Sequence, residues 1–124
     1  MEVKVDMYEK PEPYTLGFRA QANGGVKIWN ENKAFKAKLT KAIKKVFTGP
    51  VVGLHEKIGI KITVLYPCDY KATERPDLDN LVKSIIDAAT GIIYPDDGQV
   101  TRINAYKRAG VSEEWKFRVR YIVL

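Results

Sequence analysis

The sequence predicts an α+β fold, a two-layer α/β arrangement in which two main helices pack on one small mixed β-sheet. Two segments carry apolar residues at helical spacing, residues 32–47 and 78–89. Three others have the composition or alternation of strands, residues 57–66, 99–108 and 115–124. Because both helical segments have one apolar stripe, packing them on one sheet buries these stripes. A chain of 124 residues with 45% apolar residues suits a single domain over residues 1–124.

The N-terminal third is expected to hold a short first strand, a turn-rich stretch and the first helix. The turn residues of the first 30 positions are Pro11, Pro13, Gly17, Gly24 and Gly25. In the helical segment, Phe35, Leu39 and Ile43 recur every four residues and form one apolar face. Asn32 is suited to the N-cap position, and Gly49-Pro50 stops the helix.

The rest of the chain is expected to run strand, helix, strand, strand. Between Lys57 and Tyr66 isoleucine and valine alternate with other residues, which predicts a strand with one buried face. After a polar loop, a second helix carries an apolar stripe of Leu78, Leu81, Val82, Ile85, Ile86 and Ala89. Gly91 ends this helix, and a turn at residues 95–98 leads into the last two strands.

The formal net charge is +6, and the excess is concentrated between Lys27 and Lys45. Against one acid, Glu31, this region holds the lysines Lys27, Lys33, Lys36, Lys38, Lys41, Lys44 and Lys45. Such a field is typical of a protein that binds a polyanion, although a solvated helix face would have the same composition. The single cysteine, Cys68, excludes an internal disulfide, and we expect it to be a buried thiol in a reducing cytoplasm. No apolar run approaches the ~18–20 residues of a membrane span, so no membrane association is expected.

Two acid pairs are the candidate chemical groups, and each has a structural explanation. Asp77 and Asp79 begin the second helix, where acids cap free N–H groups and complement the helix dipole. Asp96-Asp97 lies in a Pro-Asp-Asp-Gly segment that favours a turn. Lys83, four residues after Asp79, has the spacing of an ordinary helix ion pair.

The combination of these residues favours a metal site over capping and turn formation. The second helix leads directly from one acid pair to the other, so we expect both pairs at neighbouring positions on one edge of the sheet. Carboxylates brought together repel and raise one another's pKa, and a divalent cation removes that conflict. Mg²⁺ prefers a few carboxylate oxygens, with water and substrate phosphate completing its coordination.

Residues 75–89 and 94–100 closely resemble the motif of the RusA family of Holliday junction resolvases. The family pattern D-x-D-N-L-x-K-x-x-x-D-A, followed after a short gap by D-D-x-x-V, is matched here within a similarity from Ile60 to Lys107. The resemblance implies an endodeoxyribonuclease with metal-binding carboxylates at Asp77, Asp79 and Asp97 and an essential lysine at Lys83. It assigns supporting positions to Asn80, Asp87 and Asp96. The implied cofactor is Mg²⁺, for which Mn²⁺ can substitute.

The resemblance further implies that a homodimer acts on branched DNA. It would make two paired cuts across a four-way junction during recombination and repair. The expected DNA-binding residues are Arg19, Lys27, Lys36, Lys44, Arg75, Lys83 and Lys107. The N-terminal loop departs from the family, because only Arg19 remains of a Lys/Arg-Pro-Arg cluster. Trp29, Trp115 and Tyr121 are candidates for a subunit interface. Two rival classes remain open: a non-catalytic nucleic-acid-binding module, and a structural adaptor without DNA affinity.

Overall fold

The computed structural model describes residues 1–11, 16–20, 26–30, 33–71, 73, 77–110 and 113–124. For residues 16–20, 26–30 and 33 it describes the backbone only. The elements follow one another along the chain as β1 (Glu2–Met7), β2 (Leu16–Ala20), β3 (Val26–Asn30), α1 (Lys33–Val46), β4 (Ile58–Tyr66), α2 (Leu78–Ala89), the 3-10 helix η1 (Asp97–Gln99), β5 (Val100–Ala109) and β6 (Lys116–Val123). The expected helices and the last three strands are confirmed to within two residues. Asn32, the expected N-cap of α1, lies outside the described residues.

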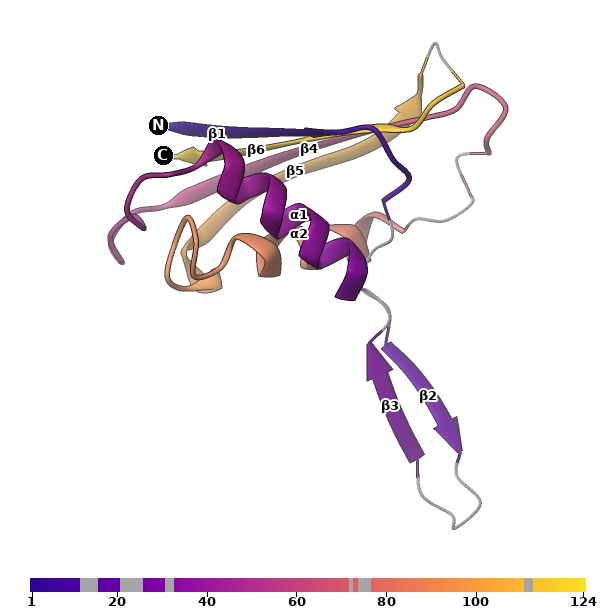
Figure 1. Ribbon diagram of the computed structural model, residues 1–124, viewed down its shortest axis with the longest axis horizontal. Coiled ribbons are helices and arrows are strands. Elements are labelled where there is room, and N and C mark those ends of the chain that lie inside the picture. The colour runs from indigo at the N-terminus through magenta and orange to yellow at the C-terminus, as the bar shows by residue number, and fades with distance from the viewer. Residues whose placement is uncertain (12–15, 21–25, 31–32, 72, 74–76, 111–112) are drawn as a thin grey trace.

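Four strands form one mixed sheet in the order β1-β6-β4-β5, and β2 pairs with β3 in a separate two-stranded sheet. Strand β4 runs parallel to β5 and antiparallel to β6, and β1 is antiparallel to β6. Both helices lie on the same side of the four-stranded sheet (Figure 1). The predicted α+β class is therefore confirmed, and among the described residues no helix covers the other face of the sheet, called here its open face.

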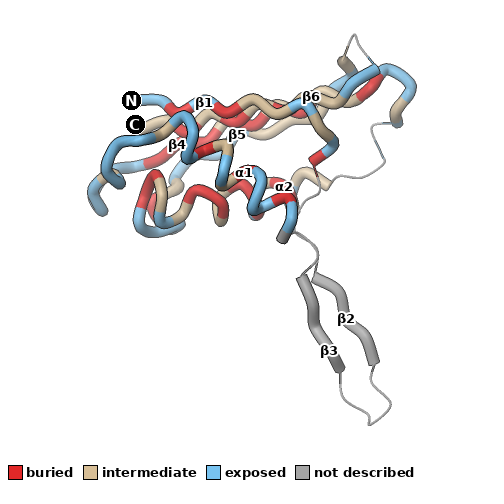
Figure 2. The backbone as a smooth tube through the Cα atoms, in the orientation of Figure 1, coloured by how far each residue is buried: buried red, intermediate tan, exposed pale blue. Residues whose placement is uncertain are grey.

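The core lies between the two helices and the sheet (Figure 2). Alternation along β4 turns Ile58, Ile60, Ile62 and Val64 towards the helices, and all four are buried. Burying an aliphatic side chain of this kind stabilises the fold by roughly 1.5–3 kcal/mol. The helices contribute Phe35, Leu39, Ile43, Leu81, Ile85, Ala88 and Ala89. Among the described residues, neither helix is long and apolar enough to cross a membrane.

Helix α2 is held in place by hydroxyl groups that satisfy its backbone carbonyls. The buried Tyr121 hydroxyl donates to the Ile85 carbonyl at 2.9 Å, and Tyr94 donates to the Ile86 carbonyl at 2.9 Å. Burial raises the pKa of both tyrosines, so each keeps its donating proton. Gly91, with φ at 87°, ends the helix as expected, because this backbone conformation strains other residues.

Two expectations about single side chains are wrong. Tyr121 is not an interface residue, because alternation along β6 turns it into the core. Cys68 is exposed, not buried, because it lies in the turn that follows β4. Trp115 is half-buried, with its ring centroid 4.6 Å from that of Tyr70.

Two ion pairs join β1 to β6 on the open face of the sheet. The Asp6 carboxylate accepts hydrogen bonds from Arg118 at 2.6 and 3.2 Å, and the Glu2 carboxylate accepts two from Arg120, both at 2.8 Å. The hydrogen bonds from Arg118 lower the pKa of Asp6 more than its partial burial raises it. Because the folded pKa lies below the unfolded value of about 3.9, the Asp6 pair stabilises the fold above that pH.

We predict that Asp6→Asn lowers the melting temperature at pH 7, and that its deficit against the unaltered chain closes as the pH falls below about 4. At low pH the unaltered Asp6 is itself protonated, so the two chains become equivalent. Thermal unfolding followed by circular dichroism between pH 3 and 7 measures this. Glu9→Gln is the control, because the Glu9–Lys38 pair is exposed and longer, at 3.4 Å, and its loss should change little. A deficit independent of pH would contradict the prediction.

Candidate active site

The first acid pair lies where the chain enters α2. Asp77 has the extended backbone of an N-cap, with φ at −78° and ψ at 134°, and its carbonyl accepts from the Leu81 amide at 3.1 Å. Its side chain makes no capping hydrogen bond. Capping, the structural explanation for an acid at this position, therefore does not account for the Asp77 carboxylate.

Asp79 and Lys83 lie one turn apart on α2, and both are exposed. Asp79 is the acid of the first turn, where the helix dipole favours negative charge. The motif residues Asn80 and Asp87 are half-buried, and the Asn80 carbonyl accepts the Ser84 hydroxyl at 3.2 Å. The polar stripe of α2 thus carries Asp79 and Lys83 into solvent, while its apolar stripe fixes the helix to the core.

In the second acid pair, the Asp96 side chain caps a helix, whereas the Asp97 side chain is exposed and lies outside the cap. The Asp96 carboxylate accepts from the Gly98 amide at 2.9 Å, and the Gln99 side chain accepts from the Asp96 amide at 3.1 Å, which together form a capping box for η1. Gln99 also donates to the carbonyls of Gly53 and Glu56 at 2.8 and 3.0 Å. These bonds fix η1 against the 53–56 loop. Asp97, the first residue of η1, is exposed.

The expectation that both acid pairs lie at one edge of the sheet is wrong. Because β4 and β5 are parallel, α2 must cross from the carboxyl end of β4 back to the amino end of β5. Asp77 and Asp79 therefore lie at one end of α2 and Asp97 lies beyond the other (Figure 1). A helix of 12 residues is about 18 Å long, so its two ends cannot share one metal ion.

Within the residues that the structure describes, no three carboxylate, histidine or cysteine side chains lie close enough together to hold a metal ion. The donor chemistry nonetheless suits a hard cation, since Asp77, Asp79 and Asp97 offer only carboxylate oxygens. His55 lies in an exposed loop and has no expected role. One chain thus holds a suitable pair of acids at one end of α2 and a third acid at the other.

The expected DNA-binding residues lie in different parts of the molecule. Lys36 and Lys44 are exposed on α1, with the other described lysines of that helix. Lys107 lies on β5 opposite Val64, on the helix side of the sheet and towards the end where α2 begins. Arg19 and Lys27 pair in register between β2 and β3, with side chains outside the described set, and Arg75 lies wholly outside it.

Sequence reasoning missed a group of cations on the open face of the sheet. In the described strands β1, β4, β5 and β6, strand register puts seven lysines and arginines on this face, called here the basic sheet face: Lys4, Lys61, Arg102, Arg108, Lys116, Arg118 and Arg120. The alternation Lys116-Phe-Arg118-Val-Arg120 was the available signal, because residues two apart on a strand share one face.

Comparison with known protein families matches residues 15–120 of the chain to the family Endodeoxyribonuclease RusA. The match covers most of the 124 residues and identifies a DNA endonuclease. The chain belongs to the RusA endodeoxyribonuclease family, whose enzymes act on branched DNA, resolve Holliday junctions and generally depend on a divalent metal. No curated protein matched the chain.

The hydrogen bonds of η1 predict different effects for its two acids. Asp96→Ala removes the capping box and should destabilise the fold by about 0.5–2 kcal/mol. Asp97→Ala changes an exposed side chain outside the capping box and should stay within about 0.5 kcal/mol of the unaltered chain. Urea unfolding of both variants measures this. A greater loss of stability for Asp97→Ala than for Asp96→Ala would contradict these roles.

Proposed function

We propose that this chain is a Mg²⁺-dependent, structure-selective endonuclease that resolves Holliday junctions by paired phosphodiester hydrolysis, in recombination and repair. The observation that carries the proposal is the exposed polar edge at the start of α2. There Asp79 and Lys83 stand one turn apart and the Asp77 carboxylate is not used as a cap. In a family of DNA endonucleases, an exposed acid and an exposed lysine beside the half-buried Asp77 are suited to a metal ion and a phosphate.

Asp77, Asp79 and Asp97 are the proposed metal-binding residues, with Mg²⁺ as the cofactor and Mn²⁺ as a substitute. Their carboxylate oxygens are the hard donors that both ions accept. When bound, such an ion supplies Lewis acidity that acidifies water and offsets charge on a phosphate.

The remaining motif residues have positioning and charge-balancing roles in this proposal. Lys83, exposed one turn beyond Asp79, brings an ammonium group to the scissile phosphate and offsets the charge that develops there. Asp96 holds η1 in the conformation that exposes Asp97. Asn80 and Asp87 support the polar stripe of α2. Arg19, Lys27, Lys36, Lys44, Arg75 and Lys107 are the proposed contacts to the DNA backbone.

A second subunit resolves the separation of the acids in this proposal. Since the two ends of α2 are about 18 Å apart, the third carboxylate at one site would be Asp97 of the partner subunit. A twofold homodimer would then carry two identical sites, each built from both chains. Two such sites match the two symmetric cuts that a four-way junction requires. We further propose a single domain over residues 1–124 and a cytoplasmic location.

Cleavage of a synthetic four-way junction tests the proposal. We expect the unaltered chain to cut it with Mg²⁺ and not with EDTA. Asp79→Asn should lower the rate by at least the ~10–100-fold that loss of an outer-shell partner causes at metal sites, because it removes a ligand charge. Binding in EDTA and the circular dichroism spectrum should stay unchanged, because Asp79 is exposed.

Asp69→Asn is the matched control, an exposed aspartate outside the motif, and it should cut normally. Junction binding without metal-dependent cutting in the unaltered chain would favour the non-catalytic binding module. Absence of both would favour a structural adaptor.

A further inference from the structure

The basic sheet face carries more positive charge than its two ion pairs neutralise. In the described strands its seven cations face two carboxylates, Glu2 and Asp6. Register sets Lys61 directly opposite Arg120, and Lys4 opposite Arg120 from the other side. Like charges directly opposite on neighbouring strands destabilise a sheet. The Glu2 carboxylate offsets part of this repulsion through its pair with Arg120, and an anion over the face would offset more of it.

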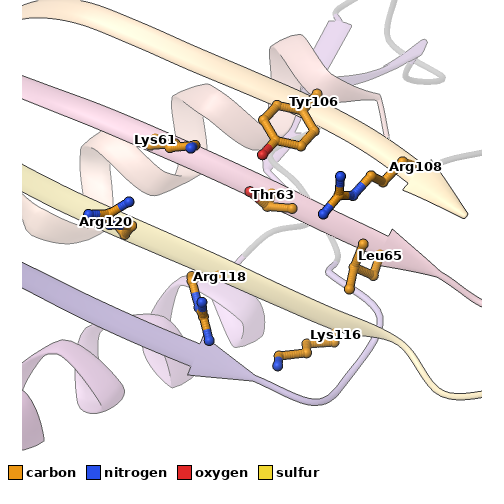
Figure 3. A pocket seen from close by; sticks show the side chains of 8 residues that line it. All are labelled: Lys61, Thr63, Leu65, Tyr106, Arg108, Lys116, Arg118 and Arg120. Atoms are coloured by element: carbon orange, nitrogen blue, oxygen red, sulfur yellow. The ribbon is translucent and has the colours of Figure 1, made fainter. Parts of the chain in front are cut away.

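The centre of this face is hollowed. A hollow of ≈ 200 Å³ is lined by Lys61, Thr63, Leu65, Tyr106, Arg108, Lys116, Arg118 and Arg120. Figure 3 shows these side chains on three neighbouring strands, β4, β5 and β6. Five of the eight are cations, and the hydroxyl groups of Thr63 and Tyr106 add further hydrogen-bonding groups. The motif acids are absent from this lining.

Several of the cations are held in position before any ligand arrives. The Arg108 guanidinium lies 5.5 Å from the centroid of the Tyr106 ring, and the Lys116 ammonium lies 5.4 Å from that of Tyr8. Arg118 and Arg120 are oriented by Asp6 and Glu2. A hydrogen bond with Thr63 lowers the pKa of Tyr106, and the charges of Lys61 and Arg108 act in the same direction.

The geometry points to a DNA ligand: we propose that the basic sheet face binds the phosphodiester backbone of a second arm of the junction. This inference rests on the proposed function. Cations on one face of a strand recur every ~6.6 Å, as do Lys116, Arg118 and Arg120 on β6. That spacing is about two nucleotides of axial rise in one DNA strand, at ~3.4 Å each.

The position of the face fits an arm other than the one cut at α2 of the same chain. Both helices lie on the opposite side of the sheet (Figure 1), so the lysines of α1 and the basic sheet face point to different regions of solvent. A branched substrate has arms to place against both. A second copy of the chain does not fit here, because a twofold contact would set this face against itself, cation against cation.

Junction binding in EDTA across a salt series tests the inference. The double variant Lys61→Gln/Arg108→Gln removes two cations of the hollow that lie outside the ion pairs with Glu2 and Asp6. We expect about tenfold weaker binding at physiological salt, and a slope of log affinity against log salt that is smaller by about two. Lys71→Glu is the control: it lowers the net charge by the same two units at an exposed position in the loop between β4 and α2, outside the strands of this face, and it should leave the slope unchanged.

The outcomes separate this inference from the proposed function. If the unaltered chain cuts normally with Mg²⁺ but the double variant keeps the same salt dependence of binding, the assignment of this face is overturned and the proposed function is not. A reduced slope in the double variant of a chain that binds but does not cut supports the face and overturns the endonuclease proposal. If the double variant keeps the same salt dependence but has a lower mass than the unaltered chain by light scattering, the face is a contact between copies of the chain, and the inference is overturned.

Discussion

The parallel pairing of β4 and β5 is the constraint on which the rest of the structure depends. Two parallel neighbours cannot be joined by a tight turn, so the chain must cross the sheet, and α2 makes that crossing. The crossing buries the apolar stripe of α2 against the sheet and exposes its polar stripe. It also separates the acids before the helix from those after it, although fewer than twenty residues divide them in the sequence.

The two ends of α2 are held in place by different contacts. The N-terminal end of α2 carries Asp77, Asp79 and Lys83, and the Tyr121 hydroxyl holds the helix by donating to the Ile85 carbonyl. The other end is fixed by Gln99 and the capping box, which use Asp96 for structure and leave Asp97 exposed. Two neighbouring aspartates therefore differ in structural role, because the Asp96 carboxylate accepts from the local backbone as a cap. The proposed metal ligands of a single chain thus lie at opposite ends of α2, which is the physical reason for proposing a dimer.

The sheet separates the molecule in a second way. Its helix side carries the motif residues and the lysines of α1, whereas its open side carries the basic sheet face. Positive charge therefore lies on both sides of the sheet, although the net charge of the chain is only +6. In the proposals above, contacts to the DNA backbone therefore lie on both sides of the sheet, whereas the residues proposed for cleavage lie on its helix side.

Much of this could be predicted from sequence, because the strongest signals were local. The apolar spacing from Leu78 to Ala89 and the alternation along β4 depend on periodicity alone, and the structure confirmed both. The relation between Asp79 and Asp97 depends on whether β4 and β5 run parallel, a non-local property that spacing does not encode. The full basic sheet face was missed because its cations come from four strands, and the alternation along β6 indicates only three of them. Cys68 was misjudged because composition does not reveal that its loop is exposed.

The central claim is that each active site draws residues from two chains, and mixing two inactive variants tests it most directly. A dimer of one Asp79→Asn chain and one Asp97→Asn chain has one doubly altered site and one intact site if the sites are shared. An equal mixture should therefore regain roughly a quarter of the intact sites, as random pairing around a twofold axis dictates, and should nick junctions. A mixture of Asp77→Asn with Asp79→Asn should stay inactive, because both changes lie in the same half of the site. No nicking in the first mixture, with mixed dimers present by light scattering, would contradict the account.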